Sequence, residues 1–178
     1  EFGAVSWMPS MVSISIIREM GPIITALICA GRIGSGIGAE LGSMRVTEQI
    51  DALEVMGVNS LNYLVFPKLV ALLLYPFLIG ISMFIGILGG YIAAVYGGFG
   101  TEADFVSGLQ QKFIPFHIAY AFIKTFIFGL ILATIPSFHG YYMKGGALEV
   151  GKASTVSFVW ASVSIIAVNY ILTQLLLT

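Results

Sequence analysis

Residues 69–101 contain no charged side chain, and this apolar run is the feature that most limits what the chain can fold into. A helix needs about 20 apolar residues to cross the hydrocarbon core of a bilayer, so the run is long enough to span one. The whole chain is 58% hydrophobic and 10% charged, which does not suit a water-soluble core. The sequence therefore predicts an integral membrane protein.

Three other stretches, at about 11–39, 115–138 and 153–178, are also long and apolar. Backbone groups in hydrocarbon must pair within their own segment, so we expect all four stretches to be helices. The prediction is an all-α, polytopic integral membrane protein with four transmembrane helices in one domain, residues 1–178. Pro22 and Pro76 should bend their helices, and Pro9 should break any helix that includes it.

The three loops between these spans differ in charge. Cytoplasmic loops carry an excess of lysine and arginine, so we expect the loops at 40–68 and 139–152 to be cytoplasmic. The loop at 97–112, which contains a predicted short helix, should lie on the opposite side. The basic residues are Arg45, Lys68, Lys144 and Lys152 in the first and third loops, and Lys112, against two acids, in the second.

Residues 31–57 form a charged segment between apolar spans and hold four of the nine acidic residues. Thr47 can cap a helix here and Gly57 can end it. The spacing of apolar residues predicts an amphipathic helix at about 47–56, outside the membrane. It either docks a partner or lies on the headgroups as a solvated connector. Its acidic face consists of Glu48, Asp51 and Glu54, and its apolar face of Val46, Ile50 and Leu53.

Two rows of small residues lie within the first predicted span, toward its carboxyl end. Small residues at four-residue spacing let another backbone approach closely, which is how helices associate in lipid. We expect close packing here, with mere flexibility as the alternative. The rows are Ala30, Gly34 and Gly38, and Gly31, Ser35 and Ala39.

Ionisable residues within the predicted spans indicate function, because each costs at least roughly 2.5 kcal/mol in hydrocarbon unless it is paired or hydrated. Arg18 and adjacent Glu19 should contact headgroups or neutralise each other. Lys124 and Asn169 come to similar depth on antiparallel helices and could meet. We expect Lys124 either to face a lipid cavity, with no carboxylate to neutralise it, or to extend toward the far interface.

No catalytic constellation is visible. His117 and His139 fall on opposite predicted sides of the membrane, and Cys29 has no partner for a disulfide or a cysteine metal site. The chain lacks a phosphate-binding G-x-x-x-x-G-K-[ST] motif. Its net charge of −1 does not indicate a basic surface that would bind nucleic acid. We expect no enzymatic activity, metal or cofactor in this chain.

The segment at residues 18–59, which contains E-L-G-x-M-R-V-T-E-Q-I-D-A-L, resembles the signature region of MlaE-type permeases. These are the membrane subunits of ABC transporters that work with MCE proteins in lipid traffic. Residues 140–176 resemble the family's last loop and span. The family's amino-terminal interfacial helix and first span have no counterpart here, and the chain opens on Glu1, so we expect a fragment or processed chain.

The resemblance implies a homodimeric, multi-pass permease of the bacterial inner membrane that moves phospholipid or a related lipid. A separate ATPase, holding ATP and magnesium, would dock on the cytoplasmic amphipathic helix. Two permease copies would enclose a lipid cavity beneath a periplasmic MCE protein. Asn169 stands where the family more usually has aspartate. The coupling residues implied are Arg45, Glu48, Gln49, Asp51 and Glu54.

The alternative is an ATP-independent secondary transporter or channel. Ion-coupled carriers usually need paired acids within their spans, and no such pair is visible in the sequence. A purely structural scaffold is a third possibility. The charged amphipathic helix favours the permease.

Overall fold

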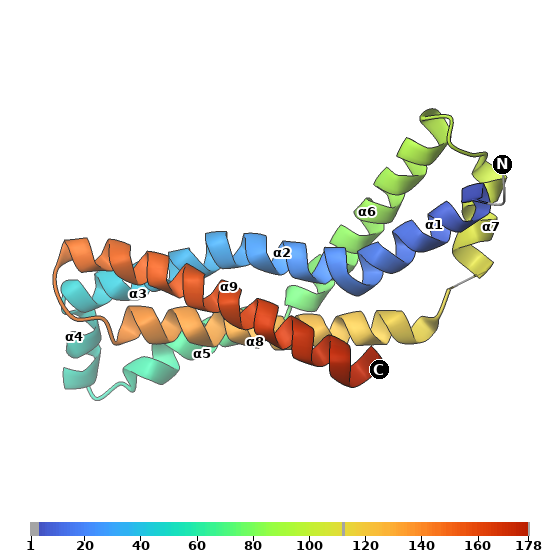
Figure 1. Cartoon of the computed structure of the whole chain (residues 1–178). Coiled ribbons are helices and arrows are strands. Elements are labelled where there is room, and N and C mark those ends of the chain that lie inside the picture. The colour runs from blue at the N-terminus through green and yellow to red at the C-terminus, as the bar shows by residue number, and fades with distance from the viewer. Residues whose placement is uncertain (1–3, 112, 178) are drawn as a thin grey trace. The chain divides into compact units, whose positions relative to one another are not determined.

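A computed structural model describes residues 4–111 and 113–177, so Lys112 lies outside the described residues. Every secondary-structure element in this part of the chain is a helix (Figure 1). Four helical stretches of the described chain are long and apolar enough to cross a membrane. The predicted all-α, polytopic membrane fold is therefore confirmed. The stretches are Trp7–Val46, Ser60–Tyr96, Pro115–Tyr141 and Ala147–Leu176.

The first stretch is one continuous helical path. It comprises α1 (Ala4–Ser15), a π-helical turn (Ile16–Met20), α2 (Gly21–Cys29), a second π-helical turn (Ala30–Gly34) and α3 (Ser35–Val46). The expectation that Pro9 breaks the helix is wrong, because Pro9 lies inside α1. Neighbouring groups in membrane proteins can satisfy the backbone that a proline leaves unpaired.

The second stretch is interrupted near Pro76, as predicted. It comprises α5 (Ser60–Leu72) and α6 (Tyr75–Tyr96). The break lies at residues 73–74, so Pro76 falls in the first turn of α6, where its missing N–H needs no helical partner. The stretch begins earlier than the predicted start at residue 69, so Lys68 belongs to α5 rather than to a loop. Lys68 forms an ion pair with Glu40 of α3 at 2.8 Å.

The remaining helices are α7 (Glu102–Gln111), α8 (Pro115–Tyr141) and α9 (Ala147–Leu177). The predicted short helix in the middle loop is present as α7. The loop predicted at 139–152 is shorter in the structure, because α8 continues to Tyr141 and α9 starts at Ala147. Gly145, with a φ of +125°, takes a backbone conformation in this turn that glycine adopts without steric cost.

The described chain divides into two compact units. Unit 1 contains residues up to Thr25 together with Phe77–Lys124, and unit 2 contains Ala26–Pro76 and Thr125 onward. In unit 1, glycines of α6 pack against α1 and the first π-helical turn. A Cβ on Gly86 would lie 3.3 Å from Ile16 Cγ2, and one on Gly90 would lie 3.1 Å from Val12 Cγ1. In unit 2, α3 packs along α9.

Candidate functional site

Helix α4 (Gln49–Val55) lies outside the candidate spans and runs across the end of α3 (Figure 1). Thr47 does not cap it, contrary to expectation. The Thr47 hydroxyl instead donates to Ser43 O at 2.9 Å, at the carboxyl end of α3. Glu48, with a left-handed φ of 57°, forms the corner and precedes α4 without a side-chain cap. The helix is therefore shorter than the predicted 47–56.

The carboxyl end of α4 follows the prediction. Gly57 has a φ of +77°, and Val58 N–H donates to Leu53 O at 3.0 Å, which is the closure that a glycine after a helix permits. Ile50 is fully buried, whereas Val55 and Met56 are 89% and 67% exposed. The end of α4 thus presents uncovered apolar surface beside its acids.

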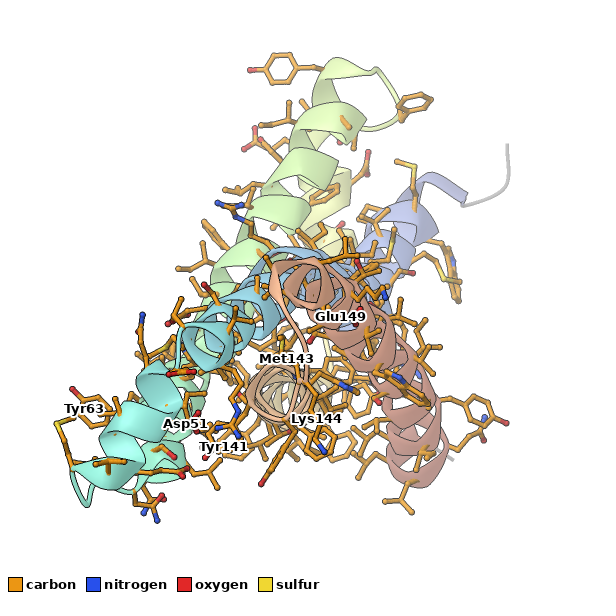
Figure 2. The ribbon with its side chains drawn as sticks, turned by 90° about the vertical axis from the view of Figure 1, so that its left-hand side faces the viewer. Asp51, Tyr63, Tyr141, Met143, Lys144 and Glu149 are labelled. Carbon is orange, nitrogen blue, oxygen red and sulfur yellow. The ribbon has the colours of Figure 1, made fainter. Side chains whose placement is uncertain are left out.

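The acids of α4 are all exposed, but two of them are engaged. Arg45 forms an ion pair with Asp51 at 2.8 Å. Ser60 Oγ donates to Glu54 Oε1 at 2.9 Å, and Tyr141 OH donates to the same oxygen at 3.1 Å. Figure 2 looks onto this end of unit 2 and shows Asp51 on α4 and Tyr141 near that helix. All three acids of the predicted acidic face are therefore solvent-exposed, although Asp51 and Glu54 also have partners within the chain.

Glu48 makes no side-chain hydrogen bond or ion pair with the part of the chain that the structure describes. Gln49 is also exposed. Both side chains lie at the start of α4 and are exposed. They are therefore open to a partner.

The contact of Glu54 with Tyr141 and Ser60 was missed by sequence reasoning. The Tyr141 and Ser60 hydroxyls lie 2.7 Å apart, so the three side chains form one network. It connects α4 to the start of α5 and the end of α8. Since 87 residues separate Glu54 from Tyr141, no local pattern could have indicated it.

A second polar cluster lies within the candidate spans of unit 1. Lys124 Nζ of α8 donates to Glu19 Oε1 at 3.0 Å and Oε2 at 2.9 Å. Tyr120 OH donates to Glu19 Oε1 at 3.3 Å, and Lys124 Nζ lies 4.7 Å from the centre of the Tyr120 ring. The Lys124 side chain is 0% exposed and that of Glu19 is 37% exposed. The charge of the lysine is thus neutralised by the Glu19 carboxylate and further stabilised by the face of the Tyr120 ring.

The backbone of the first π-helical turn contributes to this cluster. Proline has no N–H, so Pro22 cannot donate to the carbonyl of Arg18 four residues earlier. Lys124 Nζ lies 3.3 Å from that carbonyl oxygen and donates to it. Pro22 thereby leaves an acceptor that the lysine uses.

These contacts bear on three expectations. Lys124 has a carboxylate partner, so the expectation that it lacks charge neutralisation is wrong. Its buried side chain does not extend toward the far interface. Glu19 is bound by Lys124, a partner that the expectation for Arg18 and Glu19 did not include, and their contact with headgroups stays a prediction. Asn169 lies in α9 of unit 2, and its meeting with Lys124 stays a prediction.

The small residues of the first stretch lie at close helix contacts in unit 2. A Cβ on Gly38 would lie 3.0 Å from Ser157 Cβ and 3.3 Å from Ala153 O, both in α9. A Cβ on Gly140 of α8 would lie 2.8 Å from Gly38 O. Backbones of three helices therefore meet at Gly38.

The neighbouring predicted packing residues make related contacts. A Cβ on Gly34 would lie 3.3 Å from Pro136 Cγ, and one on Gly31 would lie 3.7 Å from the Phe158 ring. Ser154 Oγ donates to Ser35 O at 3.0 Å, and the Ser35 hydroxyl donates to Gly31 O. This part of the helix therefore packs against both α8 and α9.

These features define a polytopic membrane protein with an exposed, charged helix at one end of unit 2 and a neutralised ion pair within the spans of unit 1. Among the described residues, no group of three metal-ligating side chains lies together.

Comparison with known proteins identifies the family to which the chain belongs. The family model described as Permease MlaE matches residues 1–175, and the chain belongs to this family.

Several relatives cover nearly the whole chain. A probable ABC transporter permease protein of Rickettsia bellii is 39% identical over 98% of this chain and 68% of its own length. The intermembrane phospholipid transport system permease protein MlaE of Haemophilus influenzae is 33% identical over 99% of this chain and 68% of its own length. The chloroplastic protein TRIGALACTOSYLDIACYLGLYCEROL 1 of Arabidopsis thaliana is 33% identical over 92% of this chain and 47% of its own length.

Proposed function

We propose that this chain is the permease subunit of an ABC transporter that moves phospholipid between membranes and takes its energy from a separate ATPase subunit. The family and the name of the Haemophilus influenzae relative support this proposal. The structural observation that carries it is α4, a helix outside the spans with exposed acids and uncovered apolar side chains at its end.

In this proposal the ATPase docks on α4. Charged and polar side chains across an interface set orientation and association rate, and exposed Glu48 and Gln49 would take that role. Val55 and Met56 would be covered by the partner. Arg45 is held by Asp51 and orients the corner between α3 and α4. Glu54, fixed by Tyr141, would pass movement of α4 to α8.

The remaining parts of the proposed assembly follow from the family. ATP and magnesium would be bound by the ATPase, and this chain would hold no cofactor of its own. A second permease copy would complete a lipid cavity, with Arg18, Glu19, Lys124 and Asn169 as candidates to line it. A periplasmic MCE protein would receive or deliver the lipid, and the assembly would lie in the bacterial inner membrane.

Charge reversal at Glu48 tests the docking role most cleanly, because Asp51 and Glu54 have partners within the chain. We expect Glu48→Lys to lower ATPase co-purification and ATP-dependent lipid transfer between vesicles, without lowering the melting temperature. Glu102→Lys is the matched control, since Glu102 is an exposed acid in α7, outside the α4 surface. Normal ATPase binding and transfer by Glu48→Lys would reject docking at this position. Lipid transfer that needs no ATPase would support a secondary transporter instead.

A further inference from the structure

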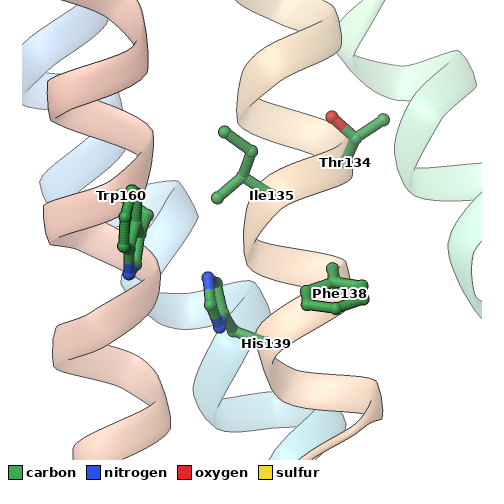
Figure 3. Close-up of a pocket in the computed structure, with 5 residues that line it drawn as sticks. All are labelled: Thr134, Ile135, Phe138, His139 and Trp160. Carbon is green, nitrogen blue, oxygen red and sulfur yellow. The ribbon is translucent and has the colours of Figure 1, made fainter.

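Two adjoining pockets lie on the surface between α8 and α9, within unit 2. The first is apolar, has a volume of about 300 Å³, and is lined by Thr134, Ile135, Phe138, His139 and Trp160. Figure 3 shows His139 and Ile135 of α8 facing Trp160 of α9. The second has a volume of about 440 Å³ and also includes Phe138 and His139. Because they share these two residues, we treat them as one surface, the α8–α9 groove.

The two ends of the groove differ in polarity. The second pocket is lined by Lys144, Glu149 and Lys152. Lys152 forms an ion pair with Glu149 at 2.6 Å, and exposed Lys144, in the loop between the helices, leaves this pocket with a net positive charge. The first turns of α9 border this pocket, and the positive end of a helix dipole favours an anion. One end of the groove is thus suited to an anionic group.

The groove also has a defined direction relative to the membrane. Lys144 lies in the loop just beyond α8, where the candidate spans end. Trp160 lies eight residues after Lys152 in α9, which is about 12 Å along a helix. If these candidate spans cross a bilayer, we expect the charged end at headgroup level and the aromatic end within the hydrocarbon. Phe138 and Trp160 are 59% and 55% exposed, so their apolar surface is available to a lipid tail.

We propose that the α8–α9 groove binds a phospholipid with an anionic headgroup, in the leaflet on the α4 side of the membrane. Lys144 and Lys152 would contact the phosphate, and an acyl chain would lie over Phe138, Ile135 and Trp160. An ammonium headgroup of zwitterionic lipid would face the same lysines less favourably. This binding does not depend on transport, so it stands or falls separately from the proposed function.

Photolabelling of the assembled transporter in phosphatidylcholine vesicles tests the site without ATP. The probe is phosphatidylglycerol with a diazirine in one acyl chain, and mass spectrometry locates the label. We expect labelling between residues 134 and 160, and unlabelled phosphatidylglycerol should compete about tenfold better than phosphatidylcholine, since each lysine near a membrane surface attracts anionic lipid. No label in this segment would show that protein covers the groove and would overturn the proposal, as would equal competition by the two lipids.

The double variant Lys144→Gln, Lys152→Gln should lower labelling by phosphatidylglycerol about tenfold. Labelling of the same segment by a diazirine phosphatidylcholine should persist, which reports that the helices are intact. Lys68→Gln is the matched control, because Lys68 lies at the same end of unit 2 but outside the groove, and it should change labelling less than about twofold. Three outcomes would contradict a headgroup-selective site. Labelling of the double variant by phosphatidylglycerol could be unchanged, or its labelling by phosphatidylglycerol and by phosphatidylcholine could fall equally. The third outcome is that Lys68→Gln lowers labelling as much as the double variant does.

Discussion

Tyr141, in the last turn of α8, donates its hydroxyl to Glu54 of α4 at 3.1 Å. The same hydroxyl lies 2.7 Å from Ser60 Oγ at the start of α5. This relationship fixes the position of α4 against two membrane-spanning stretches. Glu54, which the family resemblance implies to be a coupling residue, is therefore already hydrogen-bonded within the chain.

Tyr141→Phe removes this hydroxyl and leaves the ring. We expect a small loss of stability, about 1 kcal/mol, because a hydrogen bond to a charged acceptor is lost while Ser60 remains bound. Amide hydrogens of α4 should exchange faster, since the helix loses a tether. Tyr142→Phe is the control, because Tyr142 is exposed and next in sequence. Equal exchange of α4 in both variants would show that the hydroxyl does not hold the helix.

Lys124→Met should destabilise the permease because it leaves the Glu19 carboxylate without its cation inside a span. We expect a loss of about 1–3 kcal/mol, measured by thermal unfolding in detergent, and reduced lipid transfer. Adding Glu19→Gln should recover part of the stability, because two neutral groups replace a lone charge. If Lys124→Met alone has full stability and full transfer, the ion pair has neither a structural role nor a role in the lipid path.

Gly38→Ala should destabilise unit 2 by about 1–3 kcal/mol, the usual cost of forcing extra volume into a packed site. Its new Cβ would lie 3.0 Å from Ser157 Cβ and 3.3 Å from a backbone oxygen. Gly36→Ala is the matched control in the same helix, since nothing lies within 4 Å of its Cβ position and alanine favours helix. The measurement is the melting temperature of each variant in detergent. A lower melting temperature for Gly36→Ala than for Gly38→Ala would contradict close packing at Gly38.

The amino terminus of α7 should depend on pH through Asp104. Thr101 donates to this carboxylate from its hydroxyl at 2.6 Å and its backbone N–H at 3.2 Å, and Asp104 N–H donates back to the Thr101 hydroxyl at 3.2 Å. This reciprocal pair is a capping box. The hydrogen bonds from Thr101 lower the pKa of Asp104, because they stabilise the charged carboxylate.

A carboxyl whose pKa is lower in the folded state stabilises that state above its ordinary pKa, and the effect is lost as the pH falls through the lowered value. Amide protection in the first turn of α7 should therefore decline as the pH drops below about 4. Asp104→Asn should remove this dependence, whereas Glu102→Gln should leave it. Equal pH profiles for Asp104→Asn and the unaltered chain would show that the cap does not titrate.

The membrane spans could be predicted from sequence because long apolar runs admit few other structures, and Gly57 marked the end of α4 because few other residues adopt its backbone conformation. The predicted start of α4 was wrong. A threonine followed by an acid is typical of the start of a helix, but here Thr47 caps the end of the preceding helix, α3. The pairs Lys124 with Glu19 and Tyr141 with Glu54 could not be predicted. They join distant residues, and which faces of the helices meet is decided by packing that no local pattern contains.

The pairing of Lys124 with Glu19 also imposes an order on biosynthesis. Glu19 is made 105 residues before Lys124, which at roughly 5–20 residues per second is an interval of about 5–20 s. During that interval the first stretch must enter the bilayer with a carboxylate that has not yet met its lysine, at a cost of roughly 2.5–3.5 kcal/mol on insertion scales. This stretch therefore reaches its final stability only after the first half of α8 has been translated and inserted beside it.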